Sequence, residues 1–196
     1  AIENQPEIAF EKDFLRWMLS DGAGALLIQD TPRRDGLSLR IEWIELTSHA
    51  NELPACMYAG AQKLEDGKLR SWTQIPVEER ARDTVFAIRQ DVRLLNEHIV
   101  RHAFRQPLQR LIARRKLSAN DVDWFLPHMS SEYFRQPIAD CLHEIGFAVP
   151  PQRWFTNLTT KGNTGSAAFY IMLDELFNSG RLEPEQRLLC FIPESG

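Results

Sequence analysis

Short apolar runs separated by longer helical patterns constrain the fold of this chain most. Each run is only four to six residues long and is bounded by turn-forming residues, which predicts buried strands rather than helices. The runs occupy residues 25–28, 122–127 and 188–192. The helical patterns occupy residues 76–104, 130–146 and 167–178. Alternating strands and helices predict one α/β domain over residues 1–196, without repeats or linkers.

The remaining segments carry weaker local patterns. Residues 37–46 alternate apolar and polar side chains, so we expect them to form a hairpin with 25–28 around a turn at 31–36. A short strand is expected at 155–158, a helical or irregular stretch at 9–19, and a long irregular segment at 47–76. Pro107 follows the first helical pattern and Pro137 lies within the second, and each should kink or restart its helix.

Composition excludes several classes of function. The net charge of −4 gives no reason to expect nucleic acid or an anionic membrane as partner. No apolar run approaches the ~18 residues of a membrane span. Three scattered cysteines suit a reducing cytoplasm. A short basic cluster is interpreted as a solvated helix face, with docking of an acidic carrier protein as the alternative. It consists of Arg110, Arg114, Arg115 and Lys116.

Two polar residues stand where α/β proteins place their chemistry. His128 follows Pro127 at the carboxyl end of a predicted strand. Asn163 lies between Gly162 and Gly165 in a loop that opens an apolar helix, so a ligand can approach the backbone there. Position alone leaves two alternatives open. His128 can be a hydrogen-bonded core histidine, and Asn163 can be a helix cap.

Three motifs around these residues resemble the β-ketoacyl-acyl-carrier-protein synthase III family. They occur in the family's order and nearly span the chain. The motifs are Asp21-Gly22-Ala23-Gly24-Ala25, Pro127-His128, and Gly162-Asn163-Thr164 with Gly165-Ser166-Ala167-Ala168. The resemblance implies the C-terminal half of a thiolase-like layered α-β-α fold, with a mixed sheet and a buried helix after Asn163.

The resemblance also implies an activity, a Claisen-type condensation of acyl thioesters in fatty-acid or polyketide-type biosynthesis. His128 and Asn163 would be catalytic, because an imidazole and an amide can donate hydrogen bonds to a thioester carbonyl that becomes an enolate. The loop residues Gly162, Thr164, Gly165 and Ser166 would shape substrate binding. The substrates would be thioesters of acyl carrier protein or coenzyme A, with no metal or cofactor. A homodimer is expected, formed through an N-terminal half.

The chain departs from the family pattern in several places. No cysteine precedes Asp21, where the family nucleophile belongs, and Cys56 lies in the wrong half. We therefore expect a piece truncated at both ends. Met129 to Glu132 replace the family's residues after the histidine, which favours the dialkylresorcinol-forming relatives. An acyltransferase of the same fold, with His128 as general base, and a non-catalytic partner subunit remain the alternatives.

Two further hypotheses concern other side chains. His98 and His102 are spaced to ligate a metal from one helix, but no acidic or cysteine partner lies at matching spacing, so we expect no zinc site. Met57 and Trp72, in the irregular segment, are candidates for lining an acyl pocket.

Overall fold

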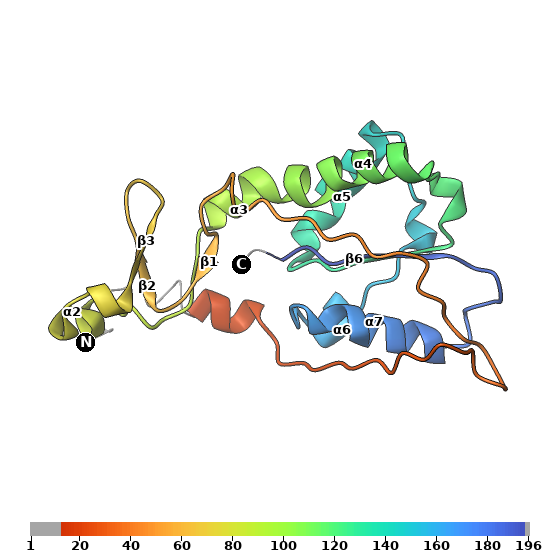
Figure 1. Ribbon diagram of the computed structural model, residues 1–196, viewed down its shortest axis with the longest axis horizontal. Helices are drawn as coiled ribbons and strands as arrows, with labels where there is room; N and C mark the ends of the chain where they lie inside the picture. The colour runs from red at the N-terminus through yellow and green to blue at the C-terminus, as the bar shows by residue number, and fades with distance from the viewer. Residues whose placement is uncertain (1–12, 195–196) are drawn as a thin grey trace.

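The computed structural model describes residues 13–194, and it is organised around one parallel pair of strands between two layers of helices (Figure 1). The strands are β1 (Met57–Tyr58), β2 (Ala61–Lys63), β3 (Leu69–Ser71), β4 (Arg89–Gln90), β5 (Trp124–Pro127) and β6 (Leu188–Phe191). The helices are α2 (Val77–Arg82), α3 (Val92–Ile99), π-helical η2 (Val100–Arg105), α4 (Gln106–Arg115), α5 (Arg135–Glu144), α6 (Leu158–Lys161) and α7 (Ala167–Asn178). Short 3-10 turns are η1 (Trp72–Gln74), η3 (Ala119–Asp121), η4 (Glu132–Phe134) and η5 (Pro151–Arg153).

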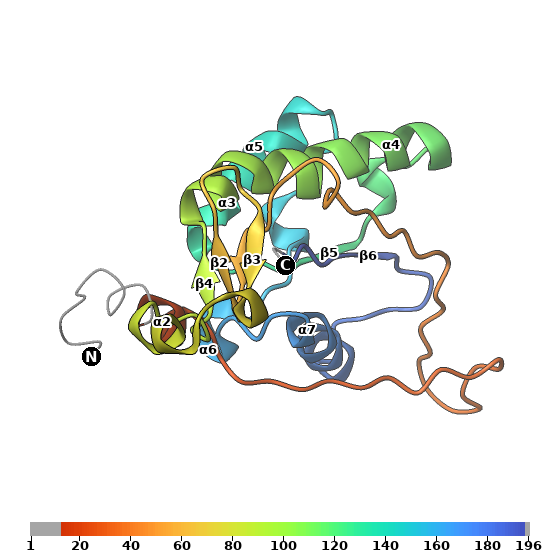
Figure 2. The ribbon, with the colours of Figure 1, turned by 60° about the vertical axis from the view of Figure 1, so that its left-hand side comes forward.

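Strand β5 is buried on both faces, and its alternating side chains divide the core in two. Phe125 packs with Leu108 of α4 and Ile138 of α5. Trp124 and Leu126 point the other way, where Leu126 joins a second core cluster with Met172 and Leu176 of α7. Two views show α4 and α5 on one side of the β5–β6 pair and α7 on the other (Figures 1 and 2). The predicted α/β layering is therefore confirmed.

The long helix of the outer layer contains a π-helical turn just before a proline. Helices α3 and α4 are joined by η2, and Pro107 lies in the first turn of α4. Proline has no backbone N–H, so it cannot close the α-helical hydrogen bond to Ala103. The widened π-helical turn takes up this defect, and the helix continues. Pro137 also lies in a first helical turn, that of α5, and so causes no break.

The predicted hairpin between residues 25–28 and 37–46 is wrong, since neither segment is a strand among the described residues. The first segment runs past α7 and the second returns along α4, so the β5–β6 pair lies between them (Figure 1). Alternation of apolar and polar residues indicates that a segment can form a β-strand. The strand forms only where a second strand lies beside it in register. Leu27 is accordingly 87% exposed and Leu46 93% exposed.

The returning segment is held by the basic end of α4. Arg114 forms an ion pair with Glu45, and the guanidinium of Arg115 lies 4.6 Å from the ring centroid of Trp43. Arg110, Arg114, Arg115 and Lys116 are all exposed, as expected for a solvated helix face, and two of them also contact the returning segment.

Other boundaries also differ from the sequence-based expectations. The helix expected over 76–104 is interrupted between α2 and α3, where β4 pairs with β1. The segment 47–76 is not wholly irregular, because β2 and β3 form an antiparallel pair within it. The strand expected at 155–158 is reduced to a single bridge between Trp154 and Phe125. The stretch expected at 9–19 lies partly outside the described residues; positions 13–18 are helical.

Strand β6, strand β5 and helix α7 match their predicted positions closely. The single mixed sheet is smaller than expected, because the described strands form three separate two-stranded sheets. Only β5 and β6 are parallel. Within residues 13–194, no helix combines the length and the apolar character that crossing a membrane requires.

Candidate functional site

His128 is held at the carboxyl end of β5 by the strand that pairs with it. Pro127 lies opposite Phe191 and has no N–H, so the next ladder donor is the backbone N–H of His128, which binds the carbonyl of Phe191 at 2.8 Å. The residue is only 6% exposed. Burial lowers the pKa of the imidazole below its ordinary value of 6.5, because a charged ring loses its hydration there. The neutral ring is the favoured state.

Asn163 is 5% exposed and is fixed through both its backbone and its side chain. Its backbone carbonyl accepts a hydrogen bond from the N–H of Ser20 at 2.8 Å. Its side-chain Oδ1 accepts from the N–H of Gly165 at 3.1 Å. The N–H of Gly165 can only donate, so the side-chain atom that faces it must be the amide oxygen. The Nδ2 group of Asn163 therefore points the other way. No hydrogen bond from Nδ2 to any residue of 13–194 is present, which leaves that donor for a ligand.

The loop around Asn163 depends on glycine at position 162. Gly162 has φ of +76°, and a Cβ there would lie 2.1 Å from the Oγ of Ser20. Gly165 also has a positive φ, of +57°, at the turn into α7. The carbonyl of Thr164 accepts from Ala167, while Ser166 is exposed at the N-cap position of α7. The predicted loop residues therefore surround Asn163.

The glycines of the first motif provide close approach, as the sequence predicts, although the segment is not a strand. A Cβ on Gly22 would lie 2.8 Å from the side chain of Thr164. A Cβ on Gly24 would lie 2.1 Å from the Cβ of Tyr170. The segment around residues 20–24 therefore lies directly against the Asn163 loop and α7.

Two positioning residues carry no motif that sequence reasoning recognised. Ser20 donates its backbone N–H to Asn163, and Asn157, which is 7% exposed, donates its Nδ2 to the Oε2 of Glu175 at 2.7 Å. The second bond ties the entry of α6 to α7. The only sequence signal was a polar residue next to one apolar neighbour, which is too common to be diagnostic.

His128 and Asn163 are both linked to β5, but by different routes. His128 follows the strand directly, whereas the chain leading to Asn163 begins beside it, with the N–H of Phe155 bonded to the carbonyl of Phe125 at 2.8 Å. Within the described residues, no hydrogen bond joins the His128 ring to the Asn163 amide. Each side chain is thus held by the scaffold rather than by the other.

None of the three cysteines has the environment of an activated nucleophile. Burial raises the pKa of the Cys190 thiol to about 12. Burial also raises the pKa of Cys141, and that of Cys56, where the nearby Asp91 carboxylate adds to the effect. A thiol with a raised pKa is a poor source of thiolate. The prediction that Cys56 is not the nucleophile agrees with this environment.

An open pocket of about 850 Å³ adjoins the segment that carries Ser20. Its walls include Leu19, which is bridged to Asn163, and the apolar side chains of Leu15, Phe86 and Ile88. Met57 and Trp72 do not line it. Trp72 instead packs on Phe86, with ring centroids 5.7 Å apart. An acyl pocket at Met57 and Trp72 stays a prediction.

Known proteins resemble this chain over the same region. The family model of the 3-oxoacyl-(acyl-carrier-protein) synthase III C terminal matches residues 112–191. A β-ketoacyl-(acyl-carrier-protein) synthase III of Synechococcus sp. is 28% identical over 172 residues, covering 84% of this chain and 44% of the relative. The chloroplastic enzyme of that name from Arabidopsis thaliana is 32% identical over 79 residues, covering 40% of this chain and 18% of the relative.

Solved structures give a similar result. The 3-oxoacyl-(acyl carrier protein) synthase III of Xanthomonas oryzae is 23% identical, with a TM-score of 0.48, and the match covers 56% of this chain and 30% of that one. The chain spans less than half the length of the curated relatives it matches. His128 and the loop from Gly162 to Ser166 all lie inside the matched residues. Residues 112–191 of this chain are thus similar to the C-terminal part of 3-oxoacyl-(acyl-carrier-protein) synthase III enzymes.

Proposed function

We propose that residues 1–196 form one C-terminal thiolase-like unit of a condensing enzyme, and that His128 and Asn163 bind the thioester carbonyl of the second substrate. The free Nδ2 donor of Asn163 carries the proposal. An amide whose oxygen is already engaged can offer only N–H to a ligand. A carbonyl oxygen that becomes an enolate oxygen accepts such a bond and gains negative charge in the transition state.

The neutral ring of His128 complements that donor. A neutral imidazole still carries one N–H, and its lowered pKa disfavours protonation that would place an uncompensated charge in a buried site. With both donors on the oxygen, a malonyl thioester loses CO2 and its electron pair forms the enolate. The enolate carbon then attacks an acyl thioester, the new carbon–carbon bond forms, and a thiolate leaves.

The acyl group in this proposal is carried by a cysteine thiolate outside these residues. Cys56, Cys141 and Cys190 all have raised pKa values, so the chain's own thiols do not suit that role. The same observation favours a second candidate, a partner subunit that does not itself carry the acyl group. In both cases the substrates are thioesters of acyl carrier protein or coenzyme A.

The remaining parts of the proposal rest on the similarity to synthase III enzymes. The enzyme would act in the cytoplasm as a homodimer, in fatty-acid or polyketide-type biosynthesis, and its reaction would use no cofactor. Gly162, Thr164, Gly165 and Ser166 would form the wall of the thioester site. Within the family, a dialkylresorcinol-forming enzyme would take a β-ketoacyl thioester as second substrate.

The test is decarboxylation of a malonyl thioester by the intact protein, measured as CO2 release with and without an acyl donor. CO2 release that depends on His128 and Asn163 supports the proposal. Acyl transfer to an alcohol or amine without CO2 release would identify an acyltransferase instead. Supplying malonyl and β-ketoacyl carriers together tests the subfamily, since turnover of the malonyl substrate alone contradicts the dialkylresorcinol hypothesis.

A further inference from the structure

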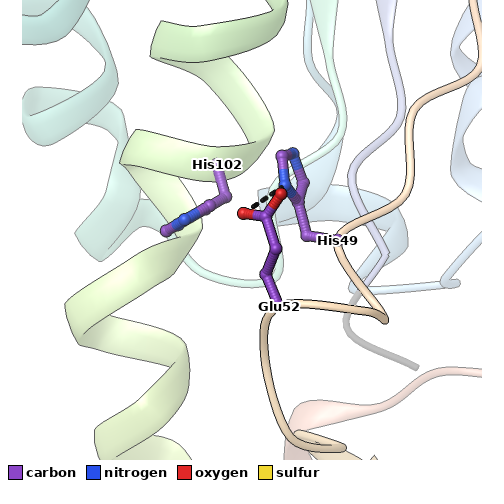
Figure 3. A group of neighbouring side chains, drawn as sticks. All are labelled: His49, Glu52 and His102. Carbon is purple, nitrogen blue, oxygen red and sulfur yellow. Dashed lines mark ion pairs between the residues drawn. The ribbon is translucent and has the colours of Figure 1, made fainter.

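Three potential metal ligands, none of which is His128 or Asn163, meet in the described part of the chain. His49 and Glu52 lie in the turn before β1, and His102 lies on η2 of the long helix. One ligand atom from each lies within 4.8 Å of the others. Figure 3 shows the Glu52 carboxylate between the two imidazoles in that view. The sequence-based argument against zinc depended on the absence of a third ligand, and the structure removes that argument.

The turn at residues 49–52 places the side chains of His49 and Glu52 next to each other. The backbone N–H groups of Glu52 and Leu53 both bind the carbonyl of His49, each at 2.9 Å. Closing the turn in this way brings side chains three positions apart next to each other. The carboxylate oxygen Oε2 of Glu52 lies 3.6 Å from Nδ1 of His49.

That separation suits a shared metal better than a hydrogen bond. Hydrogen bonds between nitrogen and oxygen are usually about 2.7–3.2 Å long. Two ligand atoms on a tetrahedral zinc ion, each about 2.1 Å from it, lie about 3.4 Å apart. Both ring nitrogens of His49 are buried and have no hydrogen-bond partner in the structure. A buried polar atom without a partner is costly, and a bound cation would satisfy one.

His102 is oriented in the way common for metal-binding histidines. Its Nδ1 lies 3.1 Å from the backbone carbonyl of His98, and a carbonyl can only accept, so Nδ1 carries the proton. The lone pair of the neutral ring is then on Nε2, available to a metal. The ring of His98 packs beside it with centroids 5.2 Å apart, and its own buried Nδ1 has no partner.

We propose that His49, Glu52 and His102 bind one zinc ion, which fastens the turn at 49–52 to the long helix. Two imidazoles and one carboxylate suit zinc, whereas magnesium and calcium prefer oxygen-only sites. The ligands come from the turn at 49–52 and from the long helix, so the zinc ion would join two segments and is assigned a structural role. The fourth position would be taken by water. This inference does not depend on the proposed function.

The test is metal binding by the purified full chain after treatment with a chelator. Cobalt titration, followed by visible absorption, and zinc competition with a chromophoric chelator should both give one site per chain. His49→Gln and His102→Gln should weaken zinc binding by about 100-fold or more. The matched control is His143→Gln, because His143 is exposed on α5, outside the cluster. Circular dichroism checks that each variant is folded.

Zinc K-edge absorption of the unsubstituted protein provides a measurement that needs no variant. It should show two imidazole ligands and no sulfur. A folded protein without stoichiometric binding would overturn the proposal, as would equal affinity in His49→Gln and His102→Gln. Sulfur coordination would assign the metal to a cysteine and would also overturn it. Edge-to-face packing of the imidazoles would then account for the cluster.

Discussion

The side-chain oxygen of Asn163 accepts a hydrogen bond from the backbone N–H of Gly165, 3.1 Å away. This bond decides which end of a nearly symmetrical amide faces the ligand. Without it, the amide could turn and present either a donor or an acceptor. The loop before α7 therefore selects the donor, and an oxyanion is the kind of ligand that benefits.

Asn163→Asp should reduce malonyl decarboxylation by about 10²–10³-fold, since a carboxylate in place of the donor repels the developing enolate. Asn163→Ala should give a loss of similar size. Asn178→Ala is the matched control, because Asn178 is exposed at the end of α7 and its side chain bonds, within residues 13–194, to Asp174 alone. Steady-state kcat of the intact protein is the measurement. Undiminished kcat in both Asn163 variants would show that the amide does not contact the reacting carbonyl.

The folded protein should lose stability below pH 6.5 because of His128. Its pKa in the folded state is lowered by burial, so the unfolded state binds the proton first as the pH falls. The contribution is fully present above the unfolded pKa of 6.5 and is lost as the pH falls toward the folded pKa. The slope should be at most about 1.4 kcal/mol per pH unit.

Urea unfolding between pH 5 and pH 8, in about half-unit steps, measures this slope. The slope for His128→Gln should be smaller than that of the unsubstituted protein, whereas His143→Gln should leave it unchanged. Equal slopes in all three proteins would mean that the ring of His128 remains hydrated in the folded state.

Gly24→Ala should destabilise the protein by about 1–3 kcal/mol, because the added methyl group would meet Tyr170 on α7. Ala23→Val is the control, since Ala23 is exposed and adjacent in the same segment. Thermal unfolding compares the two variants. A stable Gly24→Ala variant would show that residues 20–24 are not packed against α7 in solution.

Asn157→Ala should cost about 1–2 kcal/mol, because it removes a part-buried hydrogen bond of 2.7 Å from Asn157 to the carboxylate of the exposed Glu175. The bond joins α6 to α7, so decarboxylation should also weaken through displacement of Asn163. Asn157→Asp places two carboxylates together and should be worse than Asn157→Ala. Chemical denaturation and kcat together separate lost stability from lost positioning.

Removing zinc with a chelator should lower the unfolding temperature, if the histidine cluster binds the ion. An ion at 100 times its dissociation constant stabilises a protein by about 2.7 kcal/mol. Differential scanning calorimetry of His102→Gln provides the comparison, since chelation should not alter its unfolding temperature.

The sequence predicts those elements of the fold that are marked by neighbouring residues, such as an apolar run or a glycine at a turn. Runs that are apolar throughout, such as 124–127 and 188–191, marked strands that are covered on both sides. Gly146 and Gly180, which follow α5 and α7, both have a positive φ, a conformation that glycine adopts readily at helix ends. The glycines around Asn163 likewise marked a loop where backbone and ligand come close.

The rest depends on contacts between distant residues. The alternation in 37–46 could not reveal that its expected partner, 25–28, lies beyond the β5–β6 pair. Likewise, the helical spacing of His98 and His102 could not reveal that a turn 50 residues earlier brings His49 against them. The pairing of Ser20 with Asn163 has the same origin, because no local pattern encodes a bridge across the whole domain.

The parallel pairing of β5 with β6 has a consequence for how the protein folds. Its neighbouring contacts, such as Asp123 with Arg187, join residues 64 positions apart, with α5, α6 and α7 between them. Closing so long a loop lowers the conformational entropy of the chain before the strand contacts can offset that loss. Folding is slower as a result. The His128 backbone bond to Phe191 belongs to this ladder, so we expect it to form among the last contacts. On a nascent chain, His128 would acquire its native position only after β6 has left the ribosome.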